Sequence, residues 1–180
     1  MVKSHTVTCF LMDQDKKCKI VVFGAFGAGK TTLIKTLDPQ SSHVEACCPG
    51  GTTTVALDYG RIQGNGIHIH IFGTPGQERF EFAREIIGRG MDGAILLVDA
   101  TSPVDDFIRH LFDSLAAVRI PFVIFLNKYD SIGARPDLIH DNFGAAVIVN
   151  VSALDRQQSL EAVCAFAQTL PPHTGTHVHS

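Results

Sequence analysis

Apolar and polar positions along the chain follow two alternating periods, which predict strands and helices in turn. Continuously apolar runs are typical of strands buried on both faces of a sheet, and they occupy residues 18–23, 93–99, 121–126 and 145–151. Two further strands, 55–62 and 67–72, flank Asn65-Gly66, a strong signal for a tight hairpin. Helical spacing predicts helices at 31–37, 78–89, 104–118 (with a cap from Ser102 and Pro103 in the first turn), 135–142 and within 154–170.

Strands that alternate with helices indicate a mostly parallel sheet with helices on both faces. We therefore predict a three-layer α/β fold whose six-stranded sheet has one antiparallel strand at an edge, because the hairpin places it there. Residues 38–53 are predicted to form a long loop, and loops of that length are commonly functional. We divide the chain into an N-terminal extension (1–15, with an extra strand or packed arm at 6–12), one domain (16–171) and a disordered tail (172–180).

Composition narrows the function classes. The chain has 180 residues, 45% of them hydrophobic and 18% charged, with a net charge of −3, as expected of one globular domain. Without a basic block, non-specific nucleic-acid binding is not expected. No membrane-spanning run, signal peptide or lipid-anchor motif is apparent, so we expect a cytoplasmic protein without a membrane anchor. The odd count of five cysteines indicates reduced thiols, and the adjacent Cys47-Cys48 leaves a redox or metal role as a minor alternative.

A glycine-rich segment carries the clearest chemistry. Gly24 to Thr31 reads G-A-F-G-A-G-K-T and fits the phosphate-loop pattern G-x-x-x-x-G-K-(S/T), between an apolar strand and a helix. Its backbone N–H groups can turn towards phosphates, and the helix N-terminus adds positive charge. Lys30 is expected to reach the β and γ phosphates, and the Thr31 hydroxyl to ligate Mg²⁺. The nucleotide-contacting residues predicted here are Gly24, Phe26, Gly27, Ala28, Gly29, Lys30, Thr31 and Thr32.

A second motif, Asn127-Lys128-Tyr129-Asp130, follows a predicted strand, at the end where ligands bind in open α/β sheets. The Asp130 carboxylate can accept hydrogen bonds from guanine N1–H and the exocyclic amine. Adenine lacks that donor pair, so the site should reject ATP by on the order of several kcal/mol. Asn127 can bond guanine N7 and tie this clamp to the phosphate loop, and the stem of Lys128 can lie over the base. After the last strand, Ser152-Ala153-Leu154 offers the Ala153 N–H to guanine O6.

The two motifs together predict binding of GTP or GDP with Mg²⁺, and with them residues 18–170 resemble the Ras-like small GTPases. Gly73-Thr74-Pro75-Gly76-Gln77 resembles their switch II segment. Residues 52–60 are most similar to a prokaryotic branch that includes the gliding-motility and actinobacterial conservon GTPases. The resemblance implies a GTP/GDP switch whose loops meet protein effectors and regulators, Roadblock-type regulators among them.

The resemblance also implies roles for individual residues. Gln77 would orient the attacking water, and the Gly76 N–H would sense the γ-phosphate. Thr54, with Thr53 as the alternative, would complete the ligation of Mg²⁺. In-line attack of water on GTP would then rely on Lys30 and Gln77 as the catalytic residues.

Gly73 departs from this pattern, because the superfamily usually has an aspartate there that holds Mg²⁺ through water. A two-residue turn at Asn65-Gly66 sets the hairpin register so that Asp58 lies opposite Gly73, with its side chain on the same face. Our hypothesis is that Asp58 supplies the missing carboxylate to the metal. A surface aspartate on a half-exposed strand is the alternative.

Phe26 is a second departure, since many relatives have glycine at the third position of the loop. A ring there would crowd the approach of a partner's arginine, so we expect slow intrinsic hydrolysis. Activation would come from movement of switch II or from Arg79 or Arg84, although a solvated helix face is the favoured interpretation of both arginines. A GTP-binding module with negligible hydrolysis is the main alternative. A small-molecule or nucleotide kinase is a third, for which no acceptor pocket is marked.

Overall fold

The structure, a computed structural model, describes residues 16–47, 54–76 and 88–171. Its strands are β1 (Lys16–Phe23), β2 (Ser42–Cys47), β3 (Thr54–Gly64), β4 (Ile67–Gly73), β5 (Gly93–Asp99), β6 (Phe122–Asn127) and β7 (Ile148–Val151). Its helices are α1 (Lys30–Leu37), α3 (Asp106–Ala117), α4 (Pro136–His140) and α5 (Arg156–Thr169). Elements therefore alternate along the chain much as the hydrophobic pattern predicts.

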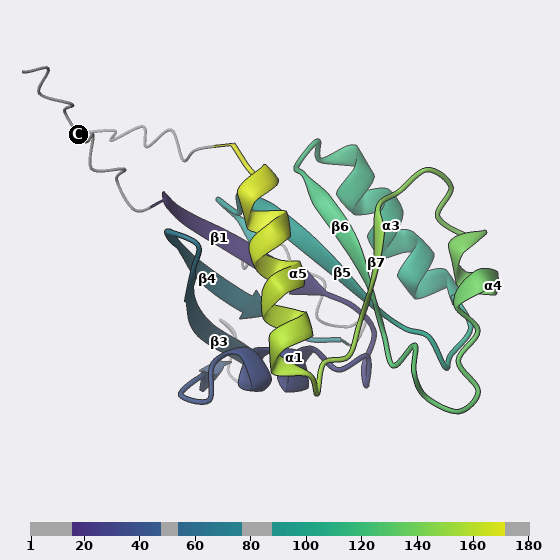
Figure 1. Cartoon of the computed structure of the whole chain (residues 1–180), viewed down its shortest axis with the longest axis horizontal. Coiled ribbons are helices and arrows are strands. Elements are labelled where there is room, and N and C mark those ends of the chain that lie inside the picture. The colour runs from purple at the N-terminus through teal and green to yellow at the C-terminus, as the bar shows by residue number, and fades with distance from the viewer. Residues whose placement is uncertain (1–15, 48–53, 77–87, 172–180) are drawn as a thin grey trace, which may run out of the picture.

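The strands form one sheet in the order β2-β3-β4-β1-β5-β6-β7 (Figure 1). Strand β1 pairs in parallel with β4 and β5, and β6 pairs in parallel with β5 and β7, whereas β3 is antiparallel to both of its neighbours. The predicted mostly parallel α/β fold is confirmed. The sheet has seven strands rather than six, because residues 42–47, which we predicted to lie in a loop, pair with β3 to form β2.

The hairpin between β3 and β4 has the predicted geometry. Asn65 and Gly66 both have positive φ angles, 52° and 72°, as expected of the two central residues of a tight hairpin turn. Gly64 consequently pairs with Ile67, and counting back along the two strands places Asp58 opposite Gly73. The register predicted from the sequence is confirmed.

Two hydrophobic cores lie on opposite faces of the sheet. Ile20 and Val22 of β1 belong to the core beneath α1 and α5, whereas Val21 and Phe23 belong to the core beneath α3. Figure 1 shows α5 crossing one face of the sheet while α3 lies on the other side of it. Because both faces are covered, β1 and β5 are apolar at successive positions rather than at alternate ones.

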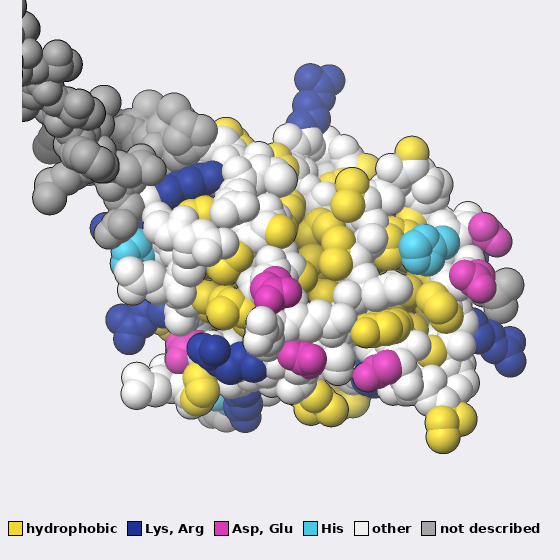
Figure 2. Space-filling model, viewed as in Figure 1, with side chains coloured by type: hydrophobic (Ala, Val, Ile, Leu, Met, Phe, Trp, Pro, Cys, Tyr) yellow, Lys and Arg dark blue, Asp and Glu magenta, His cyan; other side chains and the backbone are white. Residues whose placement is uncertain are grey.

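The surface is mixed in charge. Figure 2 shows basic and acidic side chains interspersed over one face of the molecule, with hydrophobic side chains gathered between α5 and β7. No helix in the described ranges has both the length and the apolar composition that crossing a bilayer requires.

Helix α3 corrects one prediction about a cap. It begins at Asp106, and the carboxylate of Asp105 accepts a hydrogen bond from the Ile108 N–H at 2.9 Å, so Asp105 and not Ser102 is its cap. The prolines at 171–172 follow the end of α5 as predicted. Three predicted segments lie wholly or almost wholly outside the described residues: the strand at 6–12, the helix at 78–89 and the tail at 172–180.

Candidate nucleotide-binding site

The phosphate loop connects β1 to α1, and two of its glycines are required by close contacts. Gly24 and Gly29 have φ angles of 151° and 102°, which disfavour any residue with a side chain. A Cβ atom on Gly24 would lie 2.4 Å from the Leu97 carbonyl oxygen, and one on Gly29 would lie 2.4 Å from Nδ2 of Asn127. The loop is therefore pressed against the ends of β5 and β6.

Lys30, the first residue of α1, lies across this loop. Its side chain is buried, and its ammonium group donates hydrogen bonds to the carbonyl oxygens of Gly24 at 2.8 Å and Ala25 at 2.7 Å. A positive charge is thus held against the backbone at the N-terminus of a helix, where the helix dipole also favours anions. This arrangement is suited to binding phosphate groups.

Asn127 joins three segments of the site. Its side chain is buried, its Nδ2 donates to the Ala28 carbonyl oxygen at 2.8 Å, and its Oδ1 accepts from the Ala153 N–H at 2.9 Å. The phosphate loop, the end of β6 and the turn after β7 are consequently held together by one amide. The sequence predicts the first of these contacts. The Ala153 N–H, which we expected to meet guanine O6, donates to Asn127, and its contact with the base stays a prediction.

Lys128 bridges the clamp and the loop. The backbone of Lys128 has a positive φ angle of 61°. Its ammonium group donates hydrogen bonds to the Gly27 carbonyl oxygen at 3.1 Å and to the Asp99 carboxylate at 2.5 Å. Burial raises the pKa of Asp99, but hydrogen bonds from Lys128 and Thr101 outweigh it and hold that pKa below its ordinary value. Lys128 is thereby fixed between β5, β6 and the loop.

Asp130 is the exposed member of the clamp. Within the described ranges its carboxylate makes no hydrogen bond or ion pair. Both oxygens are therefore accessible to the two donors on the edge of a guanine ring. Selectivity of the predicted kind depends on such an acceptor remaining unpaired until the base binds.

The turn after β7 is fixed by residues that the sequence analysis did not single out. The Ser152 N–H donates to Gln158 Oε1 at 2.8 Å, and the Ser159 hydroxyl donates to the Ser152 carbonyl oxygen at 2.9 Å. Asp155 caps α5 by accepting from the Gln158 N–H at 3.0 Å. Leu154, predicted to contact the nucleotide, is 81% exposed. Of these contacts only the cap at Asp155, an aspartate directly before a helical pattern, has a local sequence signal.

Asp58 faces the phosphate loop from β3. Its carboxylate is buried, with Oδ2 accepting from the Thr31 hydroxyl at 2.5 Å and Oδ1 lying 2.8 Å from Nδ1 of His43. Thr31 is the first-turn threonine of α1, and His43 belongs to β2. The aspartate is thus directed towards the predicted magnesium ligand and is not a surface residue.

The segment after β4 lies directly on the loop. The N–H and the hydroxyl of Thr74 both donate to the Val22 carbonyl oxygen at 3.0 Å, which fixes the chain where it leaves the sheet. A Cβ atom on Gly76 would lie 2.6 Å from the Phe26 nitrogen and 2.7 Å from Nζ of Lys30. The backbone of Gly76 is therefore adjacent to the phosphate loop and to the Lys30 ammonium group.

Other predicted residues are less constrained. The Phe26 side chain is 80% exposed on the loop, and Thr32 is half-buried on α1. Thr54 is the first residue of β3 and pairs with Cys47, and the structure describes its backbone alone. The remaining switch predictions concern Thr53, Gln77, Arg79 and Arg84, all of which lie outside the described residues.

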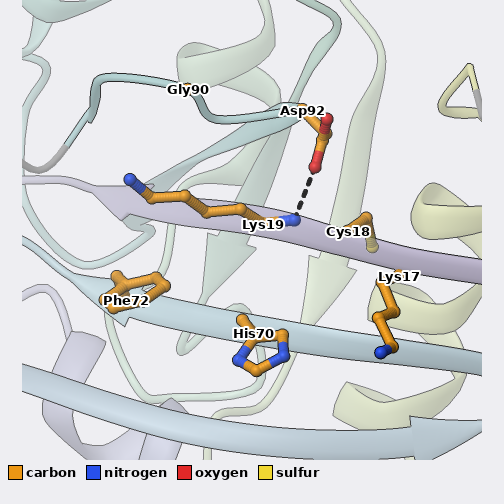
Figure 3. Close-up of a pocket in the computed structure, with 7 residues that line it drawn as sticks. All are labelled: Lys17, Cys18, Lys19, His70, Phe72, Gly90 and Asp92. Carbon is orange, nitrogen blue, oxygen red and sulfur yellow. Dashed lines mark hydrogen bonds between the residues drawn. The ribbon is translucent and has the colours of Figure 1, made fainter. Parts of the chain in front are cut away.

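A separate cavity of about 280 Å³ lies between β1 and β4 (Figure 3). Lys19 crosses it, with its backbone N–H donating to Asp92 at 2.7 Å and its ammonium group 5.2 Å from the centre of the Phe72 ring. Lys17 and Lys19 belong to the first half of β1, whereas the phosphate loop follows the end of that strand. This cavity is therefore not part of the nucleotide site.

Comparison with known proteins agrees with this geometry. The model of the elongation factor Tu GTP-binding domain family matches residues 50–171. An uncharacterized protein of Methanocaldococcus jannaschii is 40% identical over 112 residues, which are 62% of this chain and 70% of that protein. Translation initiation factor IF-2 of Pelotomaculum thermopropionicum is 30% identical over 80% of this chain, but the chain spans only 16% of that factor.

Solved structures show the same fold. Era of Aquifex aeolicus, determined with bound GDP and AlF4⁻, aligns with a TM-score of 0.64 at 22% identity, over 87% of this chain and 57% of that one. The G domain of the FeoB iron transporter of T. maritima aligns with a TM-score of 0.62 at 19% identity, over 84% and 99% of the two chains.

A phosphate loop joined to a guanine clamp on this sheet defines the class of P-loop GTPases. The chain belongs to the elongation factor Tu GTP-binding domain family. The matched region begins after the phosphate loop, so the loop at 24–31 supports the assignment independently.

Proposed function

We propose that the protein is a GTP/GDP switch that hydrolyses GTP with Mg²⁺. The observation that carries the proposal is the pair of hydrogen bonds of the buried Asn127 amide, one of which joins the guanine clamp to the phosphate loop and the other to the turn after β7. Two motifs that are far apart in the sequence are thereby placed side by side. Such a pair of motifs fits a guanine base with a polyphosphate attached to its ribose.

The residues present fit a magnesium ion. Mg²⁺ prefers hard oxygen ligands, and the Thr31 hydroxyl and the Asp58 carboxylate place two such groups together beside the phosphate loop. Thr31, Asp58 and, by resemblance, Thr54 would hold the ion. When bound, it would neutralise charge on the phosphate oxygens.

In this mechanism the chain binds and orients the nucleotide at both ends. Asp130 selects guanine, and Lys30 neutralises the phosphates from within the loop. The Gly76 N–H contacts the terminal phosphate, and Gln77 orients the attacking water. Loss of the terminal phosphate releases the segment that contains Gly76 and Gln77. A partner protein can then distinguish the GTP-bound form from the GDP-bound form.

The same resemblance extends the proposal to partners and rate. Protein effectors and regulators, Roadblock-type proteins among them, would bind the switch loops, as in the prokaryotic Ras-like branch. The ring of Phe26 is exposed on the loop, and the backbone nitrogen of the same residue lies against Gly76; both support slow hydrolysis in the absence of a partner. It equally favours a second candidate, a module that binds GTP and hydrolyses it negligibly. The resemblance to IF-2 covers too little of that factor to assign a role in translation.

Calorimetric titration of the whole chain with GTP, GDP and ATP in the presence of Mg²⁺ tests the proposal. We expect the guanine nucleotides to bind and ATP to bind at least about 100-fold more weakly. Equal binding of ATP and GTP, or binding of neither, would overturn it. Phosphate release in a single turnover, with enzyme in excess over GTP, then separates the switch from the second candidate.

A further inference from the structure

We propose that Asp58 supplies the carboxylate of the magnesium site from strand β3, in place of the side chain that Gly73 lacks on β4. The inference rests on the proposed function and assigns a metal-binding role within it. Four observations carry it: the strand register, the direction of the carboxylate, its burial, and the space over Gly73.

The register places the two residues in contact. Asp58 and Gly73 are directly paired in the antiparallel ladder of β3 and β4. Side chains of paired residues emerge on the same face of a sheet, with their Cβ atoms roughly 4.5–5.5 Å apart. A carboxylate on β3 can therefore occupy the space that a carboxylate on β4 would occupy.

The Asp58 side chain does occupy that space. A Cβ atom built on Gly73 would lie 3.3 Å from Cβ of Asp58 and 3.4 Å from its Oδ2, and only 2.9 Å from Cδ1 of Ile34. Any residue other than glycine at position 73 would displace the aspartate or the isoleucine. The missing side chain on β4 and the carboxylate on β3 are thus two parts of one arrangement.

The carboxylate is directed towards the metal ligand. Its Oδ2 is 2.5 Å from the hydroxyl of Thr31, the residue that the phosphate-loop motif assigns to Mg²⁺. Its Oδ1 is fixed by His43, so both oxygens have a defined orientation. Asp58 is only 8% exposed, and a buried carboxylate is costly unless hydrogen bonds or a cation compensate it. The position of Oδ2 against the Thr31 hydroxyl favours a role in holding a cation, and burial together with the contact to His43 fixes the side chain in that position.

The test compares the release of fluorescently labelled GDP from the wild-type chain and from Asp58→Asn over a series of free Mg²⁺ concentrations. Asparagine keeps the shape of the side chain and removes its charge. We expect the Mg²⁺ concentration for half-maximal slowing of release to rise by about 10–100-fold. Release in excess EDTA should be unchanged. Electron paramagnetic resonance of Mn²⁺ added to the GDP complex gives a direct measure of metal affinity, which should fall by a similar factor.

Two further variants complete the design. Asp113→Asn, on the exposed face of α3, removes the same charge far from the site and should behave as wild type. The exchange variant Asp58→Gly/Gly73→Asp returns the carboxylate to β4 and removes its contact with position 58. We expect it to recover part of the Mg²⁺ dependence.

The inference would be overturned if Asp58→Asn left the Mg²⁺ concentration for half-maximal slowing of GDP release unchanged. It would also be overturned if the variant released GDP faster by the same factor in EDTA and in Mg²⁺, since that would indicate a structural role. In both cases wild-type GDP binding would leave the proposed function standing. Failure of the wild-type chain to bind guanine nucleotides would instead overturn the proposed function itself.

Discussion

The side chain of Asn127 joins Ala28 of the phosphate loop to the strand that carries the guanine clamp, through a hydrogen bond of 2.8 Å to the Ala28 carbonyl oxygen. The other end of the same amide accepts from the Ala153 N–H. All three residues are buried. The relative position of the phosphate loop and the clamp therefore depends on this side chain before any ligand binds.

Replacing Asn127 with alanine should accordingly lower both stability and nucleotide affinity. The change leaves two buried backbone groups without partners, and each costs about 1–3 kcal/mol in the free energy of unfolding. Urea denaturation measures the loss, and GDP titration measures the affinity. The control Asn142→Ala, just after α4, removes an exposed hydrogen bond from Arg109 and should change stability by less than about 0.5 kcal/mol. Wild-type stability and GDP affinity in Asn127→Ala would contradict this account of the site.

A second prediction concerns the choice of base. Asp130→Asn replaces one acceptor oxygen by an amide donor, which would face the N1–H and the exocyclic amine of guanine. We expect GDP affinity to fall by about 10⁴-fold, the range for a site that hydrogen-bonds its ligand specifically. Xanthosine diphosphate, which has a carbonyl in place of that amine, should bind better to the variant than to the wild type.

Competition against labelled GDP measures both affinities. Asp141→Asn removes another exposed carboxylate, next to α4, and serves as the control, because no role in binding is assigned to it. If both variants lower GDP affinity equally, the effect is one of net charge and Asp130 does not read the base.

Much of the site is predictable because its signals are local. The glycine spacing of the phosphate loop and the polar end of β6 are readable from a few adjacent residues. The pairing of Asp58 with Gly73 is predictable although the two residues are far from the turn. Asn65-Gly66 fixes the position of the turn, and the turn fixes the register of every pair along the two strands.

Strand β2 was not predictable in the same way. Its sequence, with His43 and Glu45 at alternate positions, has a weak apolar pattern, and it becomes a strand by pairing with β3. The cap of α3 illustrates a different limit, since Ser102 and Asp105 are both good capping residues and only the helix position distinguishes them. The hydrogen bonds of Asp58 to Thr31 and His43 depend on three separate elements meeting, which no local pattern encodes.

The close approach of Gly76 to the phosphate loop leads to a third prediction. In Gly76→Ala the added methyl group would lie 2.6 Å from the Phe26 nitrogen, so the segment after β4 must move away from the loop. A shift of about 1 Å at a reacting centre can lower the rate about 10²-fold. We expect single-turnover GTP hydrolysis to fall by this order, while GDP affinity, which depends on the clamp, changes little.

Gly88→Ala is the matched control, because its Cβ would have no neighbour closer than 3.8 Å. Phosphate release from GTP is measured for both variants under the same conditions. Normal hydrolysis by Gly76→Ala would show that the segment does not act from the position seen here.

The ion pair of Asp99 with Lys128 gives a prediction about pH. Because the pKa of Asp99 is lower in the folded protein than its ordinary value of 3.8, its ionised form stabilises the fold. This stabilisation is fully present above pH 3.8 and is lost as the pH falls through the lower folded-state pKa. The free energy of unfolding of the wild type should therefore exceed that of Asp99→Asn at neutral pH, and the difference should shrink in acid.

Urea denaturation of both proteins from neutral pH to below 3.8 measures this difference. Lys128 is 38% exposed in its side chain and Asp99 is 15% exposed, so added salt should also reduce the difference at neutral pH. A difference that stays constant with pH would mean that packing of the side chain, rather than its charge, contributes the stability. If the difference in free energy of unfolding grows in acid instead, the pKa of Asp99 is raised by folding and not lowered. The ion pair with Asp99 would then not explain how Lys128 is held between the clamp and the phosphate loop.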